Sequence, residues 1–145
     1  MQVETLRTTT AARLAIISID TTLRAAACAL SSAQIGLAVV CDASGRVAGV
    51  VSKSDVVRHI ANVGAADAPI ADLMSGDVVS CRPEDDLYVT WQKMTAQSLQ
   101  NMPLLDADAK PVGVLDVRDA LKVLFEQEEY QERLLINYVA GVGYQ

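Results

Sequence analysis

The second half of this chain repeats the pattern of the first half at a fixed distance. A shift of 64 residues aligns the two halves without a gap and keeps the class of residue from position to position. A period of about 60 residues present twice predicts two like units that pack together, because one such unit cannot cover its own sheet. The shift pairs, among others, Leu23 with Leu87, Asp42 with Asp106, Ala43 with Ala107, Gly49 with Gly113, Val50 with Val114 and Asp55 with Asp119.

Each unit is expected to have the element order β-α-β-β-α. Apolar runs bounded by turn residues indicate strands, and apolar residues at helical spacing after an N-cap residue indicate helices. In the first unit these are strands over 15–19, 37–41 and 46–51, a helix from Asp20 to about 32, and a helix from 53 to about 62–64. In the second unit they are strands over 78–81, 102–105 and 112–115, and helices opening at 82–86 and near 116.

The connecting segments complete this prediction. Residues 64–70 are small and turn-prone and read as a linker, and residues 1–14 show little periodicity apart from a short helical piece at 3–6. Gly45 supplies a position for positive φ in the first hairpin turn. The predicted fold is of the α/β class, α+β in type. Its two units pack face to face about a pseudo-two-fold axis and leave two equivalent clefts.

Composition and charge argue against several classes of function. Apolar residues make up 51% of the chain but aromatic residues only 4%, so stacking platforms for single-stranded nucleic acid are scarce. The net charge of −6 opposes binding to nucleic acid or to an anionic membrane. Three cysteines without a C-x-x-C pair, and one histidine, argue against a disulfide framework or a metal site. Without a leader-like segment or a long apolar run, we expect a soluble cytoplasmic protein.

A short motif follows each hairpin: a glycine, two apolar residues, a polar residue, two variable residues and an aspartate. The corner between strand and helix offers free backbone N–H groups and the positive end of a helix, which suits a polar ligand. Ser52 and Asp55 also match a helix capping box, which needs no ligand. From the residues alone both interpretations stay open. The two copies read Gly49-Val50-Val51-Ser52-Lys53-Ser54-Asp55 and Gly113-Val114-Leu115-Asp116-Val117-Arg118-Asp119.

These duplicated motifs resemble those of the tandem cystathionine β-synthase (CBS) domain pair, or Bateman module. The resemblance covers roughly residues 3–126, with CBS repeat 1 over 3–64, CBS repeat 2 over 70–126 and a helical tail over 127–145. It implies a stand-alone regulatory module or sensor, not an enzyme, that binds AMP, ADP, ATP, NAD or S-adenosylmethionine between the repeats. It implies no required cofactor and no metal. The alternative is a structural dimerisation or protein-interaction module with vestigial ligand sites.

Carried onto this sequence, the resemblance implies a first ligand site at the first motif. Asp55 is expected to take the ribose hydroxyls, because a carboxylate only accepts hydrogen bonds and both hydroxyls donate. Ser52, Ser54 and the helix N-terminus are expected to face phosphate. Lys53 and Arg58 flank the motif, where they could approach a phosphate, but we expect them in solvent. The other expected contacts are Val50, Val78 and Val79 at the adenine, and Gln100 and Asn101, whose lack of charge implies modest phosphate affinity.

The second motif departs from the pattern and is expected to form a weaker site. Asp116 replaces the Ser or Thr, which removes a donor and adds a negative charge near any phosphate. Arg118 would offset this charge by turning inward, and Asp119 keeps the ribose role. We expect this site to be empty or to take an uncharged or cationic adenosyl group. Opposite it the first repeat offers Ile16, Ile17, Ile35 and Gly36, with no charged group.

The C-terminal tail is acidic first and apolar later. It carries four glutamates between 126 and 132 and then a largely apolar run over 134–142. Such a helix either folds back on its own domain or contacts another chain. Because CBS pairs commonly form dimers, we expect a homodimer, with an unidentified regulated protein as a further partner.

Overall fold

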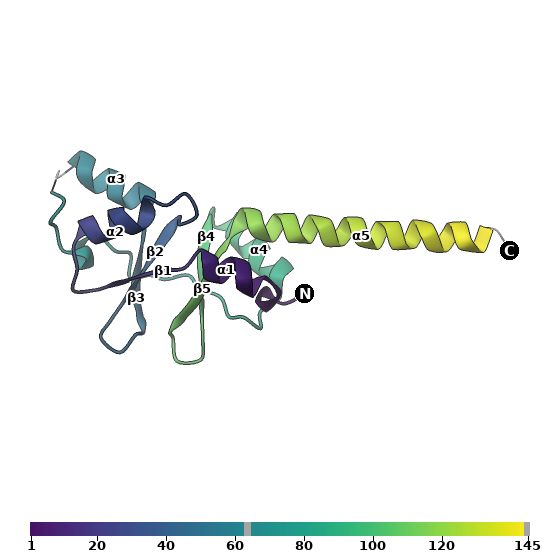
Figure 1. Cartoon of the computed structure of the whole chain (residues 1–145), viewed down its shortest axis with the longest axis horizontal. Helices are drawn as coiled ribbons and strands as arrows, with labels where there is room; N and C mark the ends of the chain where they lie inside the picture. Colours follow the sequence, from purple (N-terminus) through teal and green to yellow (C-terminus); the bar gives the residue numbers. More distant parts are fainter. Residues whose placement is uncertain (63–64, 144–145) are drawn as a thin grey trace.

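The computed structural model describes residues 1–62 and 65–143, so the expected end of repeat 1 at 64 and the last two tail residues lie outside the described part. Two small sheets form the body, and helices pack around them (Figure 1). The first half contains β1 (Ala15–Ser18), α2 (Leu23–Leu30), β2 (Leu37–Cys41), β3 (Val47–Ser52) and α3 (Lys53–Asn62). The second half contains α4 (Leu87–Ala96), β4 (Asn101–Leu105), β5 (Pro111–Asp116) and α5 (Val117–Gly143). Short helices η1 (Val3–Leu6), α1 (Arg7–Ala12) and η2 (Ile70–Asp72) precede the two halves.

The strand pairing confirms the internal repeat residue by residue. In the first sheet Leu37 pairs with Ser52, and in the second sheet Asn101 pairs with Asp116, which lie 64 residues further on. Both hairpins also carry an irregularity at the same place, after Val40 and after Leu104. The mixed α+β class and the extra C-terminal helix are confirmed as well.

The two sheets pack against each other through an apolar cluster, as the one-sided sheets predict. Leu37, Val39 and Cys41 of β2 and Val114 of β5 are its buried members. The hairpin tips also touch, since the Val47 backbone N–H donates to the Ala109 carbonyl at 2.9 Å.

The segment that precedes each repeat packs into the other one. Val3 and Leu6 lie in the core of the second half, and Ile70 lies in the core of the first. These crossing segments explain the glycine at the head of each motif. A Cβ on Gly49 would lie 2.8 Å from the Ser75 carbonyl, and one on Gly113 would lie 2.7 Å from the Thr10 hydroxyl.

Three local predictions were wrong. The strand predicted over 78–81 is reduced to an isolated parallel bridge at Cys81, where the chain meets the edge of β4 for one residue only. The helix predicted to open at 82–86 begins at Leu87, because Asp86 is its N-cap and the preceding residues form a turn. The helix expected from Asp20 begins at Leu23 after the N-cap Thr22.

Helix α1 was not predicted at all. Its sequence, RTTTAA, has no apolar stripe that would indicate a helix. It forms against β5, where Thr10 is 2% exposed. The short helical piece at 3–6 is confirmed as η1.

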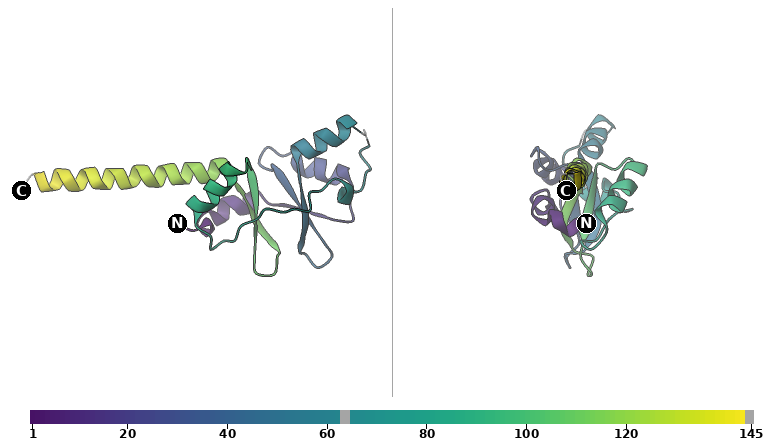
Figure 2. Two further views of the ribbon diagram at one scale, coloured as in Figure 1. Left: turned by 180° about the vertical axis from the view of Figure 1, so that it is seen from behind. Right: turned by 90° about the vertical axis from the view of Figure 1, so that its right-hand side faces the viewer.

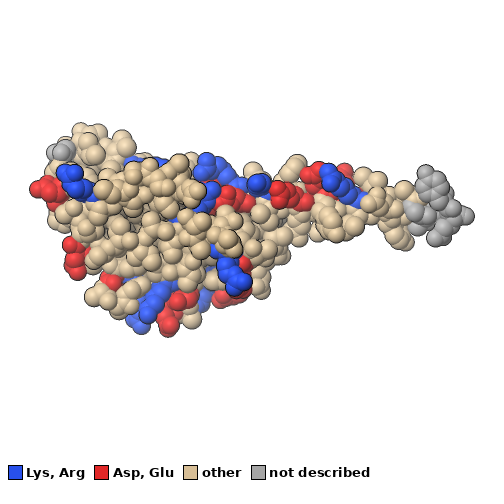
Figure 3. Space-filling view, viewed as in Figure 1, with Lys and Arg blue, Asp and Glu red and all other residues tan. Residues whose placement is uncertain are grey.

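Helix α5 does not fold back on the body. Its 27 residues extend about 40 Å at the usual rise per residue, and both ribbon views show it projecting away from the sheets (Figures 1 and 2). Charged side chains gather along its middle, and uncharged surface follows toward its end (Figure 3). None of the helices described here is both long and apolar enough to span a bilayer.

Candidate ligand-binding cleft

A cleft of about 570 Å³ lies between the two repeats. It brings together residues that the sequence assigned to two separate sites. Ser52, Ser54, Gln100 and Asn101 come from the expected first site, and Gly36 and Arg118 from the second. The remaining lining residues are Arg13, Ala33, Leu37, Lys53, Ser98 and Leu99.

The beginnings of β2 and β4 meet in this cleft. A Cβ on Gly36 would lie 2.7 Å from the side-chain nitrogen of Asn101, so a larger residue at 36 would displace the amide. Leu37 and Asn101 are equivalent under the 64-residue shift, so the contact brings equivalent ends of the two sheets together. The cleft is therefore lined by both halves of the duplicated fold.

The first motif forms a complete capping box at the N-terminus of α3. The Ser52 N–H donates to the Asp55 carboxylate at 2.9 Å, and the Asp55 N–H donates to the Ser52 hydroxyl at 3.2 Å. The Ser52 and Ser54 hydroxyls lie 2.9 Å apart at the cleft wall. Asp55 stands behind them, outside the lining, and accepts one hydrogen bond of 3.3 Å from Arg58. The capping interpretation is thus confirmed, and it leaves ligand contact by Asp55 as a separate proposal.

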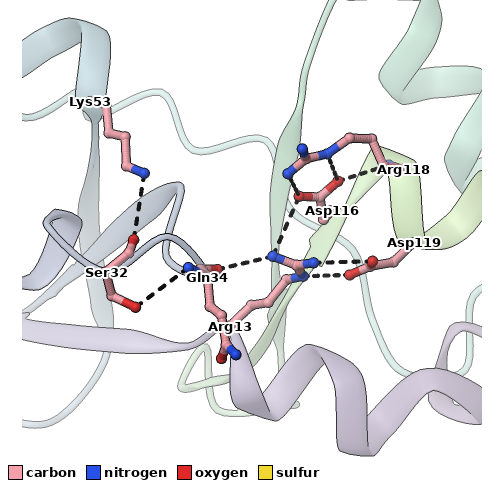
Figure 4. Close-up of polar contacts among 7 residues, drawn as sticks. All are labelled: Arg13, Ser32, Gln34, Lys53, Asp116, Arg118 and Asp119. Atoms are coloured by element: carbon pink, nitrogen blue, oxygen red, sulfur yellow. Dashed lines mark hydrogen bonds and ion pairs between the residues drawn. The ribbon is translucent and has the colours of Figure 1, made fainter.

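The second motif has a different arrangement (Figure 4). Asp116 is buried and accepts from the Arg118 backbone N–H at 2.8 Å and from two guanidinium nitrogens of Arg118 at 3.1 and 2.7 Å. Burial alone would raise the pKa of Asp116, but these hydrogen bonds and the charges of Arg118 and Arg13 outweigh it, and the pKa lies below its ordinary value. Arg118 therefore offsets the Asp116 charge, while its own side chain stays 78% exposed.

The expectation of no charged group opposite the second motif was wrong. Arg13, which follows α1, donates to both carboxylate oxygens of Asp119, at 3.1 Å from Nη2 and through Nε as well (Figure 4). Its Nη1 donates to the Gln34 carbonyl at 3.0 Å and lies 3.7 Å from Asp116. The hydrogen bond to Asp119 is the main cause of a raised pKa at Arg13. Residues before the first strand thus reach across to the second repeat.

The other expected contacts lie outside the lining of the cleft. Val50 packs against the cluster between the sheets, Val79 against the second core and Ile17 against the first. Ile16 is 53% exposed on β1, and Val78 is half-buried.

Arg13, Ala33 and Ser98 line the cleft although sequence reasoning did not single them out. For Arg13 a signal was present. The 64-residue shift extends back to it and pairs it with Asp77, so the charge at this position is reversed between the two repeats. No comparable signal marks Ala33 or Ser98.

Comparison with known proteins agrees with this geometry. The family model of the CBS domain matches the chain twice, over residues 8–62 and 70–126. The chain belongs to the CBS-domain family and carries two CBS domains in tandem.

Solved structures of other members share the fold. The CBS-domain containing protein ATU1752 of Agrobacterium tumefaciens is 25% identical, with a TM-score of 0.72 over 85% of this chain and 98% of that one. The CBS domain protein PAE2072 of Pyrobaculum aerophilum, complexed with AMP, is 22% identical, with a TM-score of 0.72 over 82% of this chain and 89% of that one. The CBS domain pair of protein MJ0100, in complex with 5′-methylthioadenosine and S-adenosyl-L-methionine, is 16% identical, with a TM-score of 0.72 over 88% of this chain and 98% of that one.

Two relatives found by sequence are longer than this chain, and the match covers a smaller share of one than of the other. An uncharacterized 17.7 kDa protein of Acidianus ambivalens is 23% identical over 128 residues, 88% of this chain and 77% of that protein. An uncharacterized 33.4 kDa protein of Thermofilum pendens is 27% identical over 65% of this chain, which is 31% of its own length.

Proposed function

We propose that this chain is a regulatory module that binds an adenosine monophosphate-type ligand in the cleft between its repeats. The observation that carries the proposal is the lining: the hydroxyls of Ser52 and Ser54 at a helix N-terminus face Gln100 and Asn101 of the other repeat. Helix N-termini with hydroxyl donors bind phosphate well. The cleft volume also falls within the range of small-molecule sites.

The charges of the cleft favour a phosphate beside Lys53. Arg13 and Arg118 are engaged by Asp119 and Asp116, so much of their charge is neutralised. The Lys53 ammonium lies 3.5 Å from the Ser32 carbonyl, its one hydrogen bond among the described residues (Figure 4). One unneutralised cation beside two hydroxyls suits a single phosphate better than a triphosphate.

In this proposal the phosphate lies in the cleft and the nucleoside extends beyond its lining, where Asp55 accepts the two ribose hydroxyls and the half-buried Val78 and Val79 pack against the adenine. The contact of Asp55 with Arg58 does not prevent ribose binding, because Arg58 is 68% exposed and surface ion pairs of this kind contribute only about 0–1 kcal/mol. AMP is the bound molecule in the PAE2072 structure, and S-adenosyl-L-methionine and 5′-methylthioadenosine in that of MJ0100. Those complexes support an adenosyl ligand here, with ADP, ATP and NAD as the remaining candidates.

Isothermal titration calorimetry with AMP, ADP, ATP, NAD and S-adenosylmethionine tests the proposal. We expect saturable binding of AMP by the full chain, and loss of that binding in Asp55→Asn. Binding of none of the five compounds, or unchanged AMP binding in Asp55→Asn, would refute it. The proposal assigns no catalysis, so incubation with AMP should return AMP unchanged.

A second candidate function is a dimerising interaction module, and α5 is the observation that favours it. Its outer part exposes Leu134, Leu135, Ile136, Tyr138 and Val139, each more than half exposed. A homodimer covers two copies of the same apolar surface at once, without a further partner. Size-exclusion chromatography with light scattering should show a dimer that Leu135→Glu dissociates and that Glu132→Gln leaves intact. A concentration-independent monomer would contradict it.

The proposed setting is the cytoplasm. The three cysteines are free thiols, and two of them, Cys41 and Cys81, are buried. Burial raises the pKa of Cys81 to about 12 and also raises that of Cys41, so both stay protonated and inert. Unpaired cysteines are typical of proteins in a reducing compartment.

A further inference from the structure

We infer that Arg13 occupies the second ribose position of this CBS pair and limits the chain to one adenosyl ligand. The inference rests on the proposed function, because it takes Asp55 and Asp119 as the two equivalent ribose-binding carboxylates. It concerns Arg13, a residue outside both motifs, and it predicts the number of ligands that the cleft accepts.

The contacts of Arg13 leave Asp119 no room for a ribose. Both carboxylate oxygens accept from the guanidinium, so the two positions that would receive the vicinal hydroxyls are filled (Figure 4). Two-point pairing of arginine with a carboxylate is among the strongest hydrogen-bonded contacts in proteins. A third bond, to the Gln34 carbonyl, holds the guanidinium in place. The side chains of Arg13 and Asp119 are only 20% and 21% exposed, so water competes weakly with the pair.

The first motif has no such occupant. The Oδ1 of Asp55 accepts from one nitrogen of Arg58, at 3.3 Å, and that arginine is 68% exposed, so a hydroxyl can replace it readily. The Oδ2 of Asp55 accepts from the Ser52 N–H at 2.9 Å and keeps a second lone pair for the other hydroxyl. The residue equivalent to Arg13 is Asp77, which is exposed. The equivalence is secure at this point of the chain, because the Cys81–Leu104 bridge matches the Ile17–Val40 pair after a shift of 64 residues. An ionised aspartate has no hydrogen-bond donor and cannot pair with Asp55 as Arg13 pairs with Asp119, so the first ribose position stays accessible.

The chain therefore breaks the symmetry of its own repeat with one change of charge. Arginine at 13 closes the second position, and aspartate at 77 leaves the first one accessible. Arg13 also belongs to the cleft lining, so its removal enlarges the same cleft that the first ligand uses.

Titration calorimetry with AMP as the probe tests this inference. We expect a stoichiometry of one per chain for the wild type and two for Arg13→Ala. Adding Asp119→Asn to Arg13→Ala should return the stoichiometry to one. Arg7→Ala is the matched control, because Arg7 is an exposed arginine at the start of α1, the short helix that Arg13 follows, and the stoichiometry of this variant should stay at one.

A converse variant tests the same idea at the first site. Asp77→Arg places a guanidinium where it can pair with Asp55, and we expect AMP binding to weaken about tenfold or more, as for the loss of one charge-assisted hydrogen bond. If Arg13→Ala does not fold, as judged by circular dichroism, Arg13→Gln replaces it. This variant removes the charge but keeps an amide that can donate to the Gln34 carbonyl.

The outcomes separate the inference from the proposed function. Two AMP molecules per wild-type chain, or one per chain in both the wild type and a folded Arg13 variant, would overturn the inference and leave the binding function standing. No AMP binding by either protein would overturn the proposed function, and the inference with it.

Discussion

Asp55 caps a helix and, in our proposal, also takes the ribose, and two substitutions separate these roles. Asp55→Ala removes the 2.9 Å hydrogen bond from the Ser52 N–H, which costs about 1 kcal/mol for an N-terminal cap. It also removes a negative charge from the first turn of α3, which costs roughly 0.5 kcal/mol more. The lost contact with the exposed Arg58 adds little. Asp55→Asn keeps an oxygen for the Ser52 N–H and loses only the charge, about 0.5 kcal/mol.

These free energies convert into melting temperatures that a thermal melt resolves. For a chain of this size 1 kcal/mol corresponds to about 3–4 °C, so Asp55→Ala should melt about 5 °C lower and Asp55→Asn about 2 °C lower. AMP at a hundred times its Kd adds about 2.7 kcal/mol, or roughly 9 °C, to the wild type. Neither variant should respond to AMP, because an asparagine amide offers only one acceptor to two donating hydroxyls.

Asp86→Asn provides the control, because Asp86 caps α4 with a 3.0 Å bond from Val89 and does not line the cleft. This variant should lose a similar small amount of stability and keep the full response to AMP. A full AMP shift in Asp55→Asn would refute the ribose role. Unchanged stability of Asp55→Ala would refute the energetic importance of the cap.

Three further predictions concern the fold itself. Ala109 has a φ of +60°, and its equivalent in the first hairpin is Gly45. Ala109→Gly should therefore raise the free energy of unfolding in urea by about 0.5–1 kcal/mol. A loss of stability would contradict this. Gly49→Ala places a Cβ 2.8 Å from the Ser75 carbonyl and should lower the same free energy by about 1–3 kcal/mol. An unchanged free energy would contradict this, because it would show that the segment around Ser75 moves aside without cost. Because the folded pKa of Asp116 lies below its ordinary value, its contribution is complete above the unfolded pKa of about 3.9 and is lost as pH falls through the folded pKa. Between pH 6 and pH 3 the free energy of unfolding should therefore decrease less steeply in Asp116→Asn than in the wild type. Equal slopes of free energy against pH would contradict this.

The duplicated pattern predicted the strands β2 to β5 and the strand-to-helix corners. These features depend on the local order of apolar, turn and capping residues, which a sequence displays directly. The same order predicted the capping box of Ser52 and Asp55, since its two members stand three residues apart. The resemblance to CBS domain pairs, rather than the spacing, led us to expect Ser52, Ser54, Gln100 and Asn101 at one site, and all four line the cleft.

Contacts between distant segments were not predictable in this way. Helix α1 has no apolar stripe and exists because β5 covers Thr10. The strand expected at 78–81 is reduced to one bridge, because a strand needs a neighbour that offers hydrogen bonds along its length. The pair of Arg13 and Asp119 joins residues 106 positions apart, and nothing near either residue in the sequence indicates the other. Local periodicity fixes which elements form. Which charges meet across the repeats depends on how the leading segment crosses the fold, and that is a property of the packed chain.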